Sequence, residues 1–260
     1  KVGQLNSKDF PANKKYAIPL SITGASNYSL IPSQRSAILL LNRSILSSVA
    51  KVSGGEGIRI KPVGMHTKAE WTIQMSAIYS SLTRSNLTTA YLSNGTGGEF
   101  YTRISSTAGI QVKNGRDGDD TWTQIPLQAG KWLHITYVHK DKKTTVYVNG
   151  KVQKVFENSA ITFGENSMIV VGNSGYRNDY LREIRLWDKA LTESEINDYL
   201  YLPMDPATPH LISYLPLSKE METKDLKAPA GTENVTTKAR IEYVENVKFP
   251  ADELVIVNQE

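Results

Sequence analysis

The sequence contains no cysteine and only four histidines. A chain without thiols has no disulfide framework and no cysteine-ligated zinc site, and it is compatible with any redox compartment. Long apolar runs are also missing, since the longest covers residues 37–41, far below the roughly 20 residues that a membrane-spanning helix needs. The chain shows neither an initiator methionine nor a signal peptide. We therefore expect it to begin after processing or part-way through a longer chain.

Motifs of catalytic chemistry are equally scarce. The sequence has no Gly-x-Ser-x-Gly elbow, no His-Glu-x-x-His motif and no phosphate-binding glycine loop. Paired glycosidase carboxylates would be expected at alternate positions of one strand, so that both face a cleft. The closest match, Glu193 and Glu195, falls in a helix cap instead. The sequence therefore predicts a protein that is not an enzyme.

Charge is unevenly distributed along the chain. Residues 1–68 hold ten basic and two acidic residues, whereas residues 69–260 hold 20 basic and 24 acidic ones. The basic residues of the first part are scattered and are not interleaved with aromatic ones, which favours an ordinary solvated surface. The acidic excess of the second part opposes phosphate attraction, so we expect no nucleic-acid partner.

The clearest strand pattern follows residue 131. Apolar side chains recur at every second position from residue 132 to 139, as on one face of a sheet. The residues expected on that face are Leu133, Ile135 and Tyr137. A further β-branched and aromatic run ends at Asn149-Gly150, a pair that favours the positive φ angles of a tight hairpin turn.

Short strands separated by turn residues recur through the rest of the chain. They are expected at residues 16–21, 36–41, 71–78, 89–92, 98–104, 110–113, 122–125, 168–171, 184–187, 211–217, 239–244 and 254–257. This spacing predicts an all-β sandwich rather than alternating strands and helices. A Thr192-x-x-Glu195 capping box opens the one expected helix, at residues 192–201.

The stretch KWLHITYVHKDKKTTVYVNGKVQKV, followed by LREIRLWDKALTESEI, resembles the signature of the laminin-G-like, concanavalin A-type jelly-roll family. The resemblance covers residues 60–245 and implies an all-β jelly-roll sandwich. It also implies that Trp71, Trp132 and Trp187 lie in or near the core and that His134 is packed. Many family members carry an acidic pair where this chain has Arg182-Glu183, so a contact that needs the first acid is in doubt.

Three regions are expected along the chain: a partial β-sandwich-like segment at residues 1–46, a linker at residues 47–59 and the jelly roll at residues 60–260. The Ser- and Gly-rich composition of residues 47–57 indicates the linker. The string KKYAIPLSITGAS resembles the closing strands of a small β-sandwich domain of surface lipoproteins from glycan-degrading gut bacteria. This resemblance implies an extracellular, outer-membrane or periplasmic location, with membrane contact only through an upstream lipid anchor.

The most distinctive polar loop, NGRDGDD, covers residues 114–120. Asp117 and Asp119 are alternate carboxylates beside a glycine, and such oxygen ligands suit Ca²⁺. The alternative is a hairpin tip in which Asn-Gly and Asp-Gly set the turn geometry. Because the full calcium-loop pattern is absent, the turn is the favoured alternative.

Sugar binding is the other candidate, because aromatic rings stack on sugar faces while amide, carboxylate and guanidinium groups bond the hydroxyls. Loops that combine such residues flank two of the expected strands. The candidate ligands are Trp122, Asn173, Tyr176, Arg177, Asp179 and Tyr180.

The leading hypothesis is a non-catalytic carbohydrate-binding surface protein of a glycan-uptake system, steadied by Ca²⁺. Its expected partners are an oligo- or polysaccharide and outer-membrane uptake proteins. One alternative is a glycoside hydrolase in which two carboxylates, such as Asp119 and Asp179, converge in a cleft. Another is a protein-binding adhesion module, which a flat face without a groove would favour.

Overall fold

The structure is a computed structural model that describes residues 16–24, 29, 36–41, 44–55, 57–63, 69–83, 87–93, 96–113, 118–157, 162–164, 166–172 and 176–258. The chain divides into two compact units, Lys1–Ile45 and Leu46–Glu260. In the first unit, β1 (Tyr16–Ser21) and β2 (Ser36–Leu41) form a two-stranded antiparallel sheet. Both of its strands are edges, which suits the Pro19 that lacks a backbone donor.

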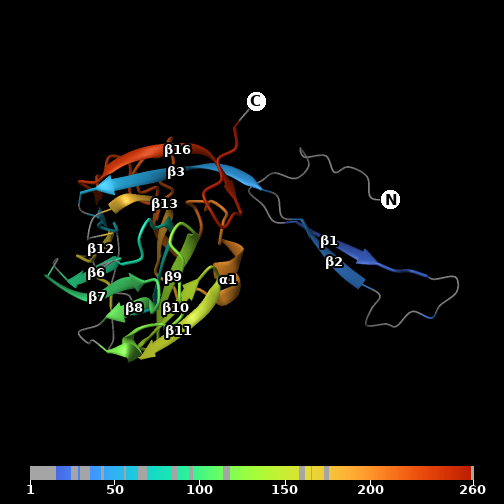
Figure 1. Ribbon diagram of the computed structural model, residues 1–260, viewed down its shortest axis with the longest axis horizontal. Helices are drawn as coiled ribbons and strands as arrows, with labels where there is room; N and C mark the ends of the chain where they lie inside the picture. The colour runs from blue at the N-terminus through green and yellow to red at the C-terminus, as the bar shows by residue number, and fades with distance from the viewer. Residues whose placement is uncertain are drawn as a thin grey trace. The chain divides into compact units, whose positions relative to one another are not determined.

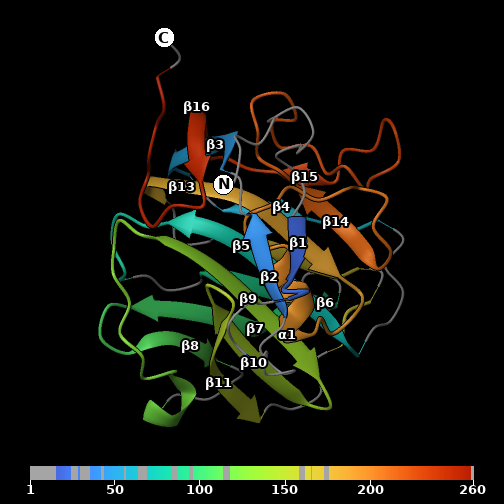
Figure 2. The same cartoon turned by 90° about the vertical axis from the view of Figure 1, so that its right-hand side faces the viewer.

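The second unit is a sandwich of two antiparallel sheets (Figure 1). The eight-stranded sheet has the order β11-β10-β9-β5-β13-β3-β16, and β14 also pairs with β13. Its strands are β3 (Ile45–Gly54), β5 (Trp71–Ile78), β9 (Trp132–Lys140), β10 (Lys143–Val148), β11 (Lys151–Glu157), β13 (Tyr176–Trp187), β14 (Leu211–Leu215) and β16 (Arg240–Phe249). Figure 2 shows β9, β10 and β11 running side by side in this sheet.

The six-stranded sheet has the order β15-β4-β12-β6-β7-β8. Its strands are β4 (Ile58–Ile60), β6 (Thr88–Ser93), β7 (Thr96–Ser105), β8 (Gly109–Lys113), β12 (Met168–Val171) and β15 (Val235–Thr236). A short 3-10 turn, η3 (Asp119–Thr121), follows β8. The all-β jelly-roll sandwich expected from the sequence is confirmed by this arrangement.

The core lies between the two sheets and is built from the alternate apolar residues of their facing sides. Leu133, Ile135 and Tyr137 all belong to it, as their alternation predicted. Trp71 is at its centre, with the rings of Phe100 and Phe163 edge-on to it at 5.2 and 5.0 Å between centroids. Edge-to-face rings contribute about 0.5–1.5 kcal/mol beyond the area that they bury.

The expected linker at residues 47–59 is instead part of the sandwich. Residues 47–54 belong to β3, which pairs with β13, and residues 58–59 belong to β4. Val49, Ala50 and Val52 are completely buried. Serine and glycine suggested flexibility, but Ala50 and Val52 bury the core-facing side of the strand, and this burial outweighs the weak strand propensity of their neighbours.

Other local expectations have mixed outcomes. Asn149 and Gly150 adopt φ angles of 50° and 75°, as a tight hairpin requires. The capping box is present at α1 (Glu193–Asp198), which is shorter than expected. Residues 122–125 and 254–257 are not strands and contribute only isolated bridges, Gln111↔Trp122 and Val247↔Ile256.

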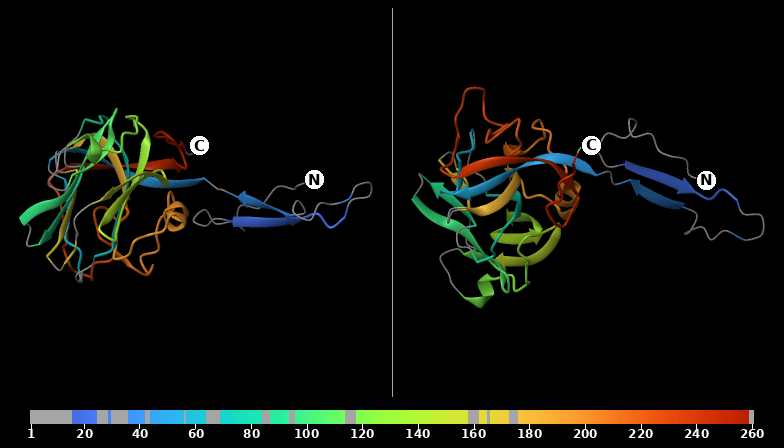
Figure 3. Two further views of the ribbon diagram at one scale, coloured as in Figure 1. Left: turned by 90° about the horizontal axis from the view of Figure 1, so that it is seen from below. Right: turned by 45° about the horizontal axis from the view of Figure 1, so that its top comes forward.

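Helix α1 and the six-stranded sheet lie on opposite sides of the sandwich (Figures 1 and 3). The helix packs through Ile196 against Val138 and Trp187, on the outer face of the eight-stranded sheet. Helix α1 therefore covers part of the outer face of the eight-stranded sheet. The outer face of the six-stranded sheet lies on the opposite side of the sandwich. None of the helices among the described residues is long and apolar enough to cross a membrane.

Candidate functional site

A continuous row of paired residues crosses the outer face of the six-stranded sheet. The pairs are Thr236↔Arg59, Arg59↔Val170, Val170↔Thr89, Thr89↔Tyr101 and Tyr101↔Lys113. Directly paired residues of antiparallel strands share a face, and the neighbours of this row in each strand, such as Ile60, Phe100 and Val112, point into the core. The row therefore lies on the outer face and links all six strands, with the completely buried Val170 at its centre.

A second, shorter row of paired residues lies beside the first, at the β8 end. Arg103 pairs with Gln111, and Gln111 forms an isolated bridge with Trp122. These three residues consequently lie on the same outer face as Tyr101 and Lys113. Tyr101 is two residues from Arg103 along β7, and Lys113 is two residues from Gln111 along β8. Arg103, Lys113 and Trp122 are each partly exposed. We call Tyr101, Arg103, Gln111, Lys113 and Trp122 the β7–β8 cluster.

The ring of Tyr101 positions two cations of this cluster. The Arg103 guanidinium carbon and the Lys113 ammonium nitrogen each lie 5.5 Å from its centroid. Arg103 also donates a 3.4 Å hydrogen bond from Nη2 to the Tyr101 hydroxyl. A cation over an aromatic ring at a partly exposed site gains about 0.5–1 kcal/mol, so both positive charges are held close to the ring.

A groove of about 540 Å³ lies at the opposite end of the row. Its lining residues are Arg59, Lys61, Pro62, Val63, Met168, Thr232, Glu233, Asn234 and Thr236. Lys61 and Asn234 are tied together by two hydrogen bonds, from Lys61 N to Asn234 O (2.8 Å) and from Asn234 Nδ2 to Lys61 O (3.1 Å). The groove thus combines cationic, amide and hydroxyl groups with an apolar wall, at a size typical of ligand sites.

Trp122, the aromatic candidate predicted beside the acidic loop, is fixed through its backbone. Lys154 donates from Nζ to Trp122 O (2.7 Å) and to Asp120 O (2.8 Å). Asp119 belongs to η3 and is exposed, while the proposed calcium ligand Asp117 lies outside the described residues. Within the described part of the chain, no group of three or more potential metal ligands comes together. Asp119 is therefore the one described acid of the predicted calcium pair.

The other sugar-binding candidates belong to β13 or lie just before it. Tyr176 and Arg177 pair with β3, on the sheet opposite Trp122, and their side chains are not among those that the structure describes. Tyr180 is half-buried in the same strand, and Asn173 lies outside the described residues. The structure therefore does not bring Trp122 together with these β13 residues, and their role in sugar binding remains a prediction.

Asp179 has a clear structural environment. Its side chain is completely buried, and Oδ1 accepts hydrogen bonds from Ser80 N (2.8 Å) and Ser80 Oγ (3.0 Å). A carboxylate without accessible surface lines no open cleft. Asp119 is exposed in a turn against the other sheet, so these two residues do not form the catalytic pair that a glycosidase would require.

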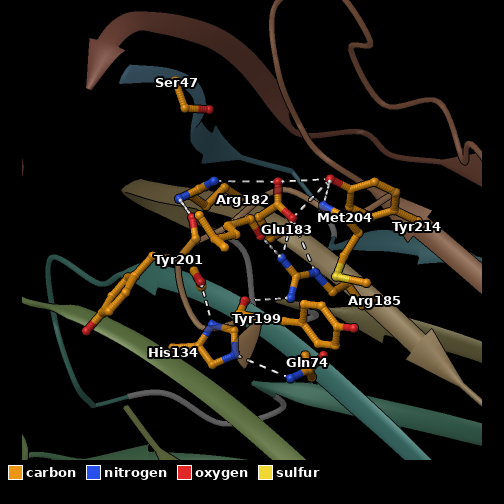
Figure 4. Close-up of polar contacts among 12 residues, drawn as sticks. Ser47, Gln74, His134, Arg182, Glu183, Arg185, Tyr199, Tyr201, Met204 and Tyr214 are labelled. Atoms are coloured by element: carbon orange, nitrogen blue, oxygen red, sulfur yellow. Dashed lines mark hydrogen bonds and ion pairs between the residues drawn. The ribbon is translucent and has the colours of Figure 1, made fainter. Parts of the chain in front are cut away.

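A second polar group lies on the outer face of the eight-stranded sheet (Figure 4). Glu183 accepts hydrogen bonds from Arg185 Nη2 (2.5 Å) and from the Tyr214 hydroxyl (3.0 Å), and it pairs with Arg182 Nη2 at 3.6 Å. These four side chains have almost no accessible surface. Together they form a buried centre that faces no solvent.

The buried centre holds the segment of residues 199–204 onto the sheet. Arg185 donates to Tyr199 O (2.9 Å) and to Leu202 O (2.6 Å), and Arg182 donates to Tyr201 O (3.3 Å). Arg182 also lies 4.0 Å from the ring centroid of Phe249. The two arginines of the buried centre thus bind backbone carbonyl groups of the protein itself, and we assign the centre a structural role.

His134, predicted to be packed, borders this centre. Burial, with a further contribution from Arg185 and then Arg182, lowers the pKa of His134 well below its ordinary value. The neutral ring fits its contacts, with Ser76 Oγ 2.8 Å from Nδ1 and Gln74 Nε2 3.5 Å from Nε2. The adjacent cavity measures only about 10 Å³, enough for one water molecule and too small for a sugar.

Sequence reasoning missed most of the exposed site. It singled out Trp122 but not the cations of β4, β7 and β8. A local signal was present, because Arg59 and Lys61 are two residues apart, as are Tyr101 and Arg103, and residues two apart share one face of a strand. The adjacency of these strands, however, depends on the order β4-β12-β6-β7-β8, which no single segment encodes.

Comparison with known proteins places this geometry in context. Residues 53–197, more than half of the chain, match the family model described as "Concanavalin A-like lectin/glucanases superfamily". No curated protein matches the sequence.

Two solved structures share the fold at low sequence identity. A "putative carbohydrate binding protein" from Bacteroides ovatus aligns with a TM-score of 0.60 and 17% identity, over 95% of this chain and 72% of that one. A heptameric SAP-like pentraxin from Limulus polyphemus aligns with a TM-score of 0.51 and 13% identity, over 77% of this chain and 94% of that one.

Proposed function

The chain belongs to the concanavalin A-like lectin/glucanases superfamily, and we propose that it is a non-catalytic carbohydrate-binding protein that uses the outer face of its six-stranded sheet. The observation that carries this proposal is the groove of about 540 Å³ at one end of a polar row that reaches the β7–β8 cluster at the other. A neighbouring fold described as carbohydrate-binding supports the same ligand class.

The chemistry of the face suits a saccharide. Amide and hydroxyl groups at Asn234 and Thr232 complement sugar hydroxyls, while Met168 and Trp122 offer apolar surface to the sugar ring. A groove also argues against a flat protein-adhesion surface. Modest affinity is favoured, since association has a large entropic cost.

The finer proposal places this protein in a glycan-uptake system at a bacterial surface, with outer-membrane uptake proteins as partners and a lipid anchor upstream. Calcium is an optional part of this proposal. Asp119, exposed in η3 just before Trp122, is the described carboxylate that would contribute to holding the ion. If calcium orders this loop, sugar affinity at Trp122 will rise with millimolar Ca²⁺.

A glycan array, probed with and without millimolar Ca²⁺, tests the proposal. Trp122→Ala is expected to weaken binding about tenfold or more, in line with the loss of a stacked aromatic ring. Tyr147→Ala is the matched control, because this half-buried tyrosine lies in β10 beside the α1 cluster, on the other sheet. Retained binding in Trp122→Ala together with lost binding in Tyr147→Ala would move the site to the other face. An array without any bound glycan would refute carbohydrate binding.

A further inference from the structure

We infer that the glycan bound on this face is anionic, with its carboxylate or sulfate groups paired to cations of β4, β7 and β8. This inference rests on the proposed function, since it names the chemical class of the ligand for the same surface. Its starting point is the charge of the row and groove, which the general requirements of sugar binding do not explain.

Basic residues outnumber acidic ones on this surface. Arg59 and Lys61 line the groove, and Arg103 and Lys113 belong to the β7–β8 cluster. The acidic residues of the same strands, groove and adjoining turn are Glu233 in the groove lining, Glu99 in β7, and Asp119 and Asp120 in η3. With Lys154, which donates to the carbonyls of Asp120 and Trp122 at the β8 end, five basic residues stand against four acidic ones, a local excess of one positive charge.

The excess is local rather than a reflection of the whole unit. The unit of residues 46–260 contains 24 basic and 25 acidic residues, so the unit as a whole is nearly neutral. Against this background a cationic face directs an anionic ligand to one surface. A neutral polysaccharide would gain nothing from such a field.

Two of the cations are held in place before any ligand arrives. Arg103 and Lys113 both lie 5.5 Å from the Tyr101 centroid. Ordering a long side chain in advance lowers the entropy lost on binding. A guanidinium group presents a planar fork of donors that matches the paired oxygens of a carboxylate or sulfate. The ring of Tyr101 is thus better explained as a support for cations than as a stacking platform.

The cations lie at the two ends of the row, on either side of the buried Val170. Five strand spacings of about 4.8 Å separate β15 from β8, so the row is about 24 Å long. Arg59 and Lys61 are near one end, and Lys113 is at the other. A polymer with repeated negative charges satisfies both ends at once, and linked contacts of this kind raise the overall affinity.

Matched polysaccharide pairs test the inference. Polygalacturonate is compared with its fully methyl-esterified form, which has the same backbone without the charge, and dextran sulfate is compared with dextran. The first pair reports on carboxylate and the second on sulfate. We expect at least one charged member to bind about tenfold more tightly than its neutral form at 0.1 M salt. The preference should fall sharply at 1 M salt, where the Debye length is about 3 Å.

Two charge variants locate the site. Lys61→Glu alters an exposed groove residue, and we expect it to weaken binding of the charged polysaccharide about tenfold. Lys248→Glu is the matched control, because Lys248 is exposed in β16 on the other sheet. Arg103→Gln provides a second variant, which removes one charge and retains a polar side chain. Melting temperatures of all three establish that they fold.

The outcomes separate this inference from the proposed function. Preferential, salt-sensitive binding that Lys61→Glu or Arg103→Gln weakens and Lys248→Glu leaves intact supports it. Equal binding of charged and neutral members, or binding of neutral glycans alone, overturns the inference and leaves carbohydrate binding standing. An equal loss in Lys248→Glu overturns the assignment to this face. Failure to bind any polysaccharide or array glycan overturns both.

Discussion

Replacing Glu183 with glutamine is expected to destabilise the sandwich strongly. Glu183 is the carboxylate that pairs with both Arg182 and Arg185 in the buried centre, and all three side chains are at most 4% exposed. The glutamine side chain has nearly the same shape but no charge. Two guanidinium groups would then remain buried without this compensating anion.

The magnitude follows from the cost of an unpaired buried charge. Removing one partner of a buried ion pair typically costs about 3–5 kcal/mol, because the remaining charge loses its compensation. Typical domains are stable by about 5–15 kcal/mol, so this single change removes a large fraction of the unfolding free energy. For a unit of this size each kcal/mol lowers the melting temperature by about 2–4 °C. We therefore expect a decrease of about 6–20 °C.

Chemical denaturation followed by tryptophan fluorescence measures the effect, since a lower midpoint with an unchanged slope reports lost stability. Trp187 is buried in the unit under test. Glu245→Gln serves as the control, because it removes the same charge from a pair with Lys219 in which both side chains are about half exposed. We expect its midpoint to match that of the wild type. A Glu183→Gln midpoint equal to that of Glu245→Gln would refute the view that this carboxylate compensates two buried cations.

The buried centre also shows where strand alternation fails as a guide. Alternation places Arg182 and Glu183 on opposite faces of β13. In the structure, Arg182 pairs with Ser76 and Arg185 with Gln74, so Glu183 and Ile184 share one position opposite β5. This bulge, with Glu183 at a φ of 56°, brings its carboxylate to the side of both arginines. A bulge depends on the partner strand, so the sequence of β13 alone did not reveal it.

The core was more predictable than the surface. Burial of one strand face imposes a period of two, which marked Leu133, Ile135 and Tyr137 from sequence alone. The residues on the outer side of the same strand, including His134 and Thr136, are also buried. Coverage of this kind comes from segments distant in sequence, such as residues 199–204, and polar residues in a strand give no local sign of it.

Two further predictions concern backbone space and protonation. Gly55→Ala should cost about 2–5 kcal/mol, because the φ of Gly55 is 64° and the new Cβ would lie 2.3 Å from Lys238 O. Gly54 has a similar φ of 59° but open space around its Cβ position, so equal denaturation midpoints for Gly54→Ala and Gly55→Ala would contradict this clash. Stability should also fall as the pH drops below 6.5, the ordinary pKa of histidine, because burial lowers the pKa of His134 in the folded state and the unfolded chain then binds the proton first. The slope is at most about 1.4 kcal/mol per pH unit for one such group. His134→Gln should reduce this slope without abolishing it, since burial also lowers the pKa of His139, and an unchanged slope in denaturation curves measured from pH 7 to 5 would show that His134 is not the responsible group.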